Sequence, residues 1–195
     1  NVANAIFQAC QEIINGKWHT HFVVDMIQGG AGTSTNMNAN EVIANRALEI
    51  MGHEKGEYEF CHPNNHINLS QSTNDVYPTA LKIANCYSNK KLLVVLRDLI
   101  VSFRKKGHEF SHVIKMGRTQ LQDAVPMTLG QEFEAYAVTL EEEIARLEQN
   151  ARLFLEVNMG GTAIGTGINA DPKFPAIVLN HLWEITNLPV TLSKN

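Results

Sequence analysis

Two very long stretches of helical periodicity constrain the fold of this chain more than any other feature. Apolar residues recur every three or four positions from about residue 77 to 112, and again from about residue 127 to 157, which is the spacing of one helix face. At ~1.5 Å per residue, each helix would be on the order of 45 Å long. Helices of that length need partners to bury their apolar stripes. The sequence therefore predicts an all-α, long-helix bundle whose remaining helices come from missing sequence or from other subunits.

Shorter helices flank the two long ones, and strand signals are nearly absent. Helical spacing covers residues 2–13, 42–51 and 175–186, whereas residues 53–72 are expected to form a loop. We expect residues 1–71 to be the end of an N-terminal helical domain and residues 72–195 to be the first part of a central bundle. Since the sequence begins without methionine and stops soon after a helical segment, we also expect a piece of a longer protein.

Composition excludes several classes of partner. The chain carries a net charge of -4 and has no basic run, which argues against a nucleic-acid surface. No apolar run approaches the ~18 residues that cross a bilayer, and no secretion signal is visible, so we expect a cytoplasmic protein without a membrane partner. Three widely spaced cysteines, Cys10, Cys61 and Cys86, predict neither a disulfide framework nor a zinc site, but reduced and mostly buried thiols.

Three segments rich in hydroxyl and amide side chains are each expected at a helix entrance. They are "GGAGTSTNMNANE" at residues 29–41, "SQSTNDVYPTA" at residues 70–80 and "KMGRTQLQDAVPMTLGQEF" at residues 115–133. A helix N-terminus offers unpaired N–H groups and a positive dipole end, which suit a carboxylate. Capping alone is the alternative, because Asn38 with Glu41 and Ser72 with Asp75 have capping-box spacing. Three such segments together favour a shared site for an anionic molecule.

Other kinds of site receive less support. The glycines at residues 29–32 follow no clear strand and lack the Gly-Lys-Ser/Thr ending of a phosphate-binding loop. His62 and His66 are four residues apart, but Pro63 between them disfavours the helix that would place both on one metal. We therefore expect no metal site.

The polar segments, together with "HPNNHINLSQSTNDVYPTA" and "GGTAIGTGIN", resemble the aspartase/fumarase superfamily, and within it the aspartases, over nearly all of the chain. The resemblance implies a homotetramer in which each active site is assembled from three subunits. It also implies a small dicarboxylate substrate, L-aspartate or fumarate. The positions that match the family's substrate-binding residues are Thr33, Ser72, Thr73, Asn74, Thr119 and Gln120.

The implied chemistry is the reversible anti elimination of ammonia from L-aspartate to give fumarate. A base removes a proton next to one carboxylate, and the charge spreads onto that carboxylate as an aci-type intermediate. Neutral hydroxyl and amide donors stabilise such developing charge when they are held in place. The resemblance implies no metal and no organic cofactor.

Two departures from the family pattern leave the activity open. The family's catalytic serine lies in Gly-Ser-Ser-x-Met-Pro-x-Lys-x-Asn-Pro, which nothing here matches, so we expect the base outside this chain and the 195 residues alone to be inactive. Asn65 and Gln120 stand where fumarases commonly carry Asp and His; glutamine cannot exchange a proton near pH 7 as histidine can. Both residues favour ammonia elimination over fumarate hydration. An inactive helical scaffold of the same fold and a generic anion-binding module are two further hypotheses for the chain.

Overall fold

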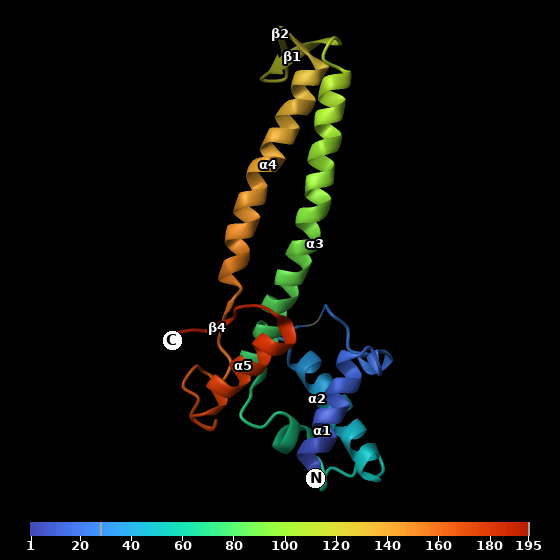
Figure 1. Cartoon of the computed structure of the whole chain (residues 1–195), viewed down its shortest axis with the longest axis vertical. Coiled ribbons are helices and arrows are strands. Elements are labelled where there is room, and N and C mark those ends of the chain that lie inside the picture. The colour runs from blue at the N-terminus through green and yellow to red at the C-terminus, as the bar shows by residue number, and fades with distance from the viewer. Residues whose placement is uncertain (28, 195) are drawn as a thin grey trace. The chain divides into compact units, whose positions relative to one another are not determined.

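The structure is a computed structural model that describes residues 1–27 and 29–194, and it is mainly helical (Figure 1). The chain divides into two compact units. Ile83–Leu155 forms the helical-pair unit, and the segments before and after it form the other, which we call the mixed unit. These divisions differ from the predicted boundary between residues 71 and 72, and the assignment of domains stays a prediction.

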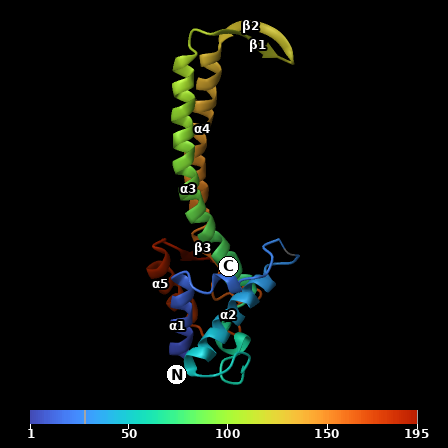
Figure 2. The same ribbon diagram turned by 90° about the vertical axis from the view of Figure 1, so that its right-hand side faces the viewer.

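The two predicted long helices are present. α3 runs over Thr73–Glu109 and α4 over Leu129–Leu153. From Ile83 onward, α3 lies beside α4 in both views (Figures 1 and 2). α4 begins with a capping box that the sequence analysis missed, in which Thr128 accepts a hydrogen bond from the Gln131 N–H and the Gln131 side chain accepts one from the Thr128 N–H.

A β-hairpin joins these helices, and the expectation of a helix entrance over residues 115–133 was wrong for most of that segment. β1 (Ile114–Thr119) pairs antiparallel with β2 (Gln122–Thr128), with an irregular register between Met116 and Arg118. The two turn residues, Gln120 and Leu121, both have left-handed φ angles, of 47° and 63°, as two-residue hairpin turns of type I′ require. Helix α4 begins only at Leu129, after the polar segment has passed through the hairpin.

The mixed unit has its own apolar core, formed where α1 (Val2–Ile14) packs on α2 (Thr33–Met51). Small side chains, Ala9, Ala44 and Ala47, let the two helices approach closely, and the buried Leu48 fills the space beside them. After η1 (His19–His21), α2 begins nearer to the glycines than predicted, at residue 33 instead of 42. The first helix was predicted correctly, and Asn15 and Gly16 follow it.

The predicted capping box of Asn38 with Glu41 was wrong because both residues lie inside α2. The Asn38 side chain instead accepts hydrogen bonds from the N–H groups of Val23 and Val24, at 3.0 and 3.3 Å, and donates one to the His21 carbonyl. It therefore fixes the connection that precedes α2 instead of capping the helix.

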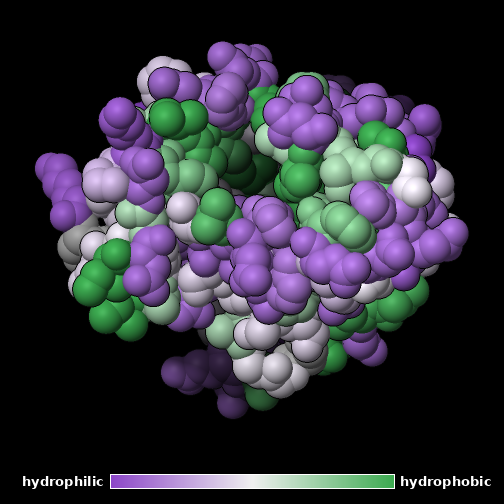
Figure 3. All heavy atoms as spheres, turned by 90° about the horizontal axis from the view of Figure 1, so that it is seen from below, coloured by the Kyte–Doolittle hydropathy of each residue, from purple (hydrophilic) through white to green (hydrophobic). Residues whose placement is uncertain are grey.

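The rest of the mixed unit contains short elements. η2 (Pro63–Ile67) is a turn of π-helix within the predicted loop, α5 (Phe174–Thr186) confirms the predicted third short helix, and β3 (Glu156–Val157) pairs in parallel with β4 (Thr191–Leu192). Hydrophobic and hydrophilic residues are interspersed on the face shown in Figure 3. Among the described residues, no helix combines the length and the apolar character needed to cross a membrane. Cys61 and Cys86 are buried and Cys10 is half-buried, and burial raises the pKa of all three thiols.

Candidate active site

The entrance of α2 lies against the first turns of α3. Gly32, the residue before α2, has a φ of 88°, and a Cβ atom there would lie 2.2 Å from two ring carbons of Tyr77. Glycine is therefore required both for the left-handed backbone and for the contact. Thr33, the first residue of α2, is exposed next to this contact. Two segments that are far apart in sequence thus meet at their helix entrances.

Buried amides connect these two entrances. The Asn36 side-chain amide donates to Thr73 Oγ1 at 3.0 Å and to Asn68 Oδ1 at 3.2 Å, and Asn40 donates to the same Asn68 oxygen at 3.1 Å. Asn36 and Asn40 are buried. A buried amide without a hydrogen-bond partner destabilises the folded protein. The network is therefore favoured, and it holds Thr73 in a defined place relative to α2.

Ser72 caps α3, as its spacing to Asp75 predicted. The Asn74 N–H donates to Ser72 Oγ at 3.2 Å, and the Ser72 N–H donates to Asp75 Oδ1 at 2.9 Å. Capping therefore accounts for part of this segment. The Asn74 side chain remains exposed at the helix entrance.

A hollow of about 390 Å³ opens at this junction. Its lining residues are uncharged, and they are Met26, Gly30, Ala31, Gly32, Asn74, Tyr77, Pro78 and Leu81. The N-terminal ends of α2 and α3 both lie at this hollow, and their dipoles favour a negative charge. The arrangement can therefore attract a carboxylate without a lysine or arginine in its described lining.

The structure brings together four of the six predicted site residues in the mixed unit: Thr33, Ser72, Thr73 and Asn74. The other two belong to the helical-pair unit, where Thr119 is the last residue of β1 and Gln120 the first residue of the hairpin turn, and both are exposed. The two predicted groups thus lie in different compact units of one chain.

Comparison with known proteins agrees with this helical fold. The sequence pattern of the lyase family matches residues 1–195. The chain belongs to the lyase family. Among curated members, it is 63% identical to aspartate ammonia-lyase of Pseudomonas canavaninivorans over 95% of this chain and 40% of that protein. It is 58% identical to aspartate ammonia-lyase of Bacillus subtilis over 97% of this chain and 40% of that protein.

Solved structures of the family share the fold. The crystal structure of a fumarate lyase:delta crystallin from Brucella melitensis, bound to cobalt, superposes with a TM-score of 0.89 at 56% identity, covering 100% of this chain and 42% of that one. A class II fumarase from Schistosoma mansoni gives a TM-score of 0.85 at 35% identity, covering 100% and 44%. The chain spans about 40% of the length of the curated relatives above.

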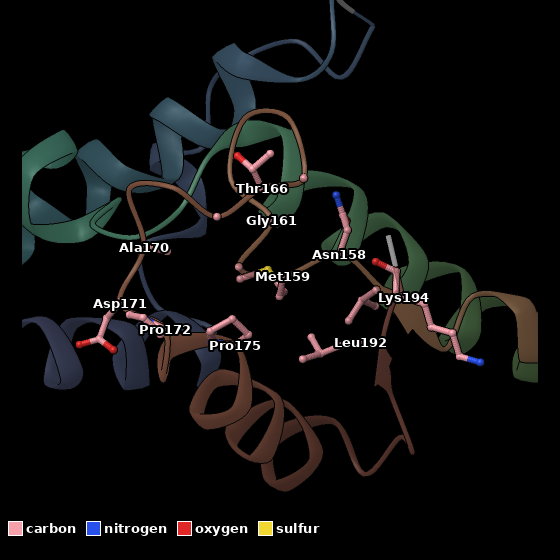
Figure 4. A pocket seen from close by; sticks show the side chains of 15 residues that line it. Asn158, Met159, Gly161, Thr166, Ala170, Asp171, Pro172, Pro175, Leu192 and Lys194 are labelled. Atoms are coloured by element: carbon pink, nitrogen blue, oxygen red, sulfur yellow. The ribbon is translucent and has the colours of Figure 1, made fainter.

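Within this lyase-family fold, sequence reasoning missed the part played by Asp75 and by the glycine-rich segment at residues 158–167. Asp75 is fully buried, and its Oδ2 accepts hydrogen bonds from the N–H groups of Gly160 and Thr162. The sequence analysis used this segment only as a motif of the family resemblance, and local spacing gives no sign of a contact between residues so distant in sequence. A second hollow of about 390 Å³ lies beside this segment, where Met159, Pro175 and Leu192 surround it (Figure 4).

The histidines considered for metal binding have structural partners. His62 Nδ1 accepts hydrogen bonds from the N–H groups of Asn64 and Asn65, and His66 Nδ1 accepts one from the His62 N–H. Since a backbone N–H can only donate, neither Nδ1 carries a proton in these contacts. Across residues 1–27 and 29–194, no group of three His, Cys, Asp or Glu side chains is arranged to hold a metal ion.

Proposed function

We propose that the full-length protein carrying this chain is an aspartate ammonia-lyase that converts L-aspartate reversibly to fumarate and ammonia. The observation that carries the proposal is the meeting of two helix entrances, with Thr33 on one and Ser72, Thr73 and Asn74 on the other, beside an uncharged hollow. Identity of 63% and 58% to aspartate ammonia-lyases supports the choice of substrate.

Thr33, Ser72, Thr73 and Asn74 would bind the substrate carboxylates through neutral donors. The charge that develops on one carboxylate when the neighbouring proton is removed is stabilised by donors whose directions are already fixed. The Asn36–Thr73 hydrogen bond supports such fixed directions. The base, a serine on a loop, belongs to sequence that this chain does not contain, and the reaction needs no cofactor.

Thr119 and Gln120 would contribute to the site from another copy of the chain in a cytoplasmic homotetramer. Both residues are exposed, as a contribution to the site of another copy requires.

The first experiment measures fumarate by ultraviolet absorbance when the full-length protein is incubated with L-aspartate and, separately, with L-malate. Fumarate from aspartate alone supports the proposal. Fumarate from malate alone favours fumarate hydratase, the alternative suggested by the 35% identity to the Schistosoma mansoni fumarase. Formation from neither substrate favours the inactive scaffold. The 195 residues alone are expected to give no fumarate.

A single-donor variant tests the assigned residues. Thr33→Val keeps the shape of the side chain and removes the hydroxyl, so we expect kcat to fall by about 10²-fold, the usual cost of losing one such donor. Thr139→Val is the matched control, because the Thr139 hydroxyl donates to the Ala135 carbonyl within α4. Equal kcat values for the two variants would remove Thr33 from the site.

A further inference from the structure

The carboxylate of Asp75 is the most completely enclosed acidic group in this part of the molecule, with an exposed fraction of 0%. Its Oδ1 accepts the Ser72 N–H at 2.9 Å, and its Oδ2 accepts the N–H groups of Thr162 and Gly160 at 2.8 and 3.2 Å. All three donors are backbone groups, and two of them belong to the glycine-rich segment. Asp75 therefore joins that segment to the first turn of α3.

The neighbouring residue strengthens the same connection. The Asn74 side-chain amide donates to the Ala163 carbonyl at 2.7 Å, and the Asn158 side chain donates to the Asn74 carbonyl at 2.9 Å. The Asn74 carbonyl is free to accept this bond because Pro78, four residues later in α3, has no N–H to donate to it. The proline inside the helix thus leaves a backbone carbonyl to which the glycine-rich segment binds through Asn158.

The shape of the segment depends on this contact. Thr162 has a left-handed φ of 55°, which is rare for a β-branched residue and costs free energy. In this conformation its N–H points at Asp75 Oδ2. Gly160 has a φ of 86°, and a Cβ atom there would come within 2.4 Å of Pro175. The segment is therefore held between α5 and the start of α3, and Asp75 supplies the acceptor on the α3 side.

Only a carboxylate suits this position. Its two oxygens accept from three donors in fixed directions, and the positive end of the α3 dipole offsets its charge. In the described part of the chain, Asp75 takes part in no ion pair. Its carboxylate is bound by backbone N–H groups instead. An asparagine of the same shape would turn an NH₂ group toward at least one of the three N–H groups.

We propose that Asp75 is a positioning residue for substrate binding. It holds the segment of residues 158–163 against the first turn of α3. It thereby fixes the positions of Ser72, which caps this turn, and of Asn74, which lines the hollow. This inference rests on the proposed function, since it assumes that Ser72 and Asn74 bind the substrate. Asp75 itself does not touch the substrate.

The test compares Asp75→Asn with the parent in the full-length protein. We expect KM for L-aspartate to rise about tenfold, since the loss of one buried hydrogen-bond partner is worth about one factor of ten in an equilibrium. We also expect faster amide hydrogen exchange in the peptide that contains Gly160 and Thr162. Asp171→Asn is the matched control, because Asp171 also accepts a backbone N–H, that of Lys173 at 2.8 Å, but makes no described bond to α3. The control should leave both quantities unchanged.

The two readouts separate positioning from a merely structural role. A purely structural role lowers the amount of active protein, so kcat per total protein would fall while KM stayed at the parent value, and that result would overturn the proposal. Unchanged exchange at Gly160 and Thr162 would overturn it too. If Asp75→Asn does not fold, Asn158→Ala loosens the same segment at the Asn74 carbonyl, and an unchanged KM in that variant counts against the proposal.

Failure of the proposed function would be recognised separately. If the parent protein forms no fumarate from L-aspartate, the proposed activity is rejected, and so is the assignment of Asp75 to aspartate binding. The exchange measurement would then still decide whether Asp75 holds the glycine-rich segment. An active parent combined with a variant of unchanged KM rejects the positioning role alone.

Discussion

The mixed unit and the helical-pair unit solve the problem of burying apolar surface in different ways. In the mixed unit, α1 and α2 enclose Ala9, Ala44 and Leu48, whose exposed fractions are all 0%. In the helical-pair unit, Val95 and Val101 remain 65% and 67% exposed although they lie in the middle of a long helix. The mixed unit encloses a core between two of its helices, whereas the helical-pair unit leaves apolar residues exposed along the middle of its long helices.

This difference teaches what long amphipathic helices require. Two helices side by side bury one stripe each, and Leu93, Ile100 and Ala137 occupy that stripe. A second apolar stripe on the same helix needs further helices. The comparison thus supports the expectation that other copies or further sequence complete the bundle, and it can be tested by substitutions that affect the two units differently.

The largest expected effect comes from truncating one leucine in each unit. Leu48→Ala should lower the free energy of unfolding of this chain by about 2–5 kcal/mol, because it leaves a cavity in a closed core. Leu92→Ala, at a side chain that is 50% exposed, should cost this chain only about 0.5 kcal/mol. Urea denaturation measures both. Equal losses in the 195-residue chain would show that the helical-pair unit is already covered, and the comparison would fail.

A smaller loss is expected at Gly130, where the backbones of the two long helices lie close together. A Cβ atom on Gly130, near the start of α4, would lie 2.4 Å from the Gly107 carbonyl oxygen in α3. Gly130→Ala should therefore cost about 2 kcal/mol through forced separation of the backbones, although alanine normally favours a helix. Gly29→Ala is the control, since a Cβ atom there has open space around it. Thermal denaturation of both variants checks the prediction, and a stable Gly130→Ala protein would contradict it.

The sequence predicted elements whose apolar periodicity runs over many turns. It found α3 and α4 because each contributes at least six apolar positions in phase. It missed the start of α2 because residues 33–40 are mainly polar, and the helix is held there by tertiary bonds such as those of Asn36 and Asn40. It missed the hairpin because the strands are largely exposed and the turn is Gln120-Leu121 instead of the usual asparagine and glycine.

Sequence reasoning also found candidate site residues, but it did not find the long-range hydrogen bonds of Asp75 that hold them in place. Ser72, Thr73 and Asn74 stand out locally, as residue types that cap helices and bind anions. The partners of Asp75 lie 85 and 87 residues away along the chain, and a local pattern contains no trace of such a contact. Whether Thr119 and Gln120 join the other residues stays a prediction, since they belong to a separate compact unit.

Within the mixed unit, buried amides should prove as important as apolar contacts. Asn36→Asp replaces an NH₂ donor with an oxygen that faces Asn68 Oδ1 and Thr73 Oγ1. We expect a loss of about 1.5 kcal/mol, the range for a buried polar group that loses its partner. Asn64→Asp, at an exposed side chain, is the control. If urea denaturation gives the same midpoint for both variants, the network does not hold the two helix entrances together.

The smallest effect concerns an ion pair at the edge of the α1–α2 core, and it depends on pH. Hydrogen bonds from Arg46, and then from Trp18, lower the pKa of Glu12 to about 2, from an ordinary value of 4.5. A folded-state pKa below the unfolded value means that the contribution to stability is fully present above pH 4.5 and is lost as the pH falls from 4.5 toward 2. Glu12→Gln should therefore lower the melting temperature at pH 7 and make no difference near pH 2. Glu59→Gln, at an exposed side chain outside the described ion pairs, should match the parent throughout. A Glu12→Gln difference that persisted unchanged to pH 2 would mean that packing, and not charge, makes this contact stabilising.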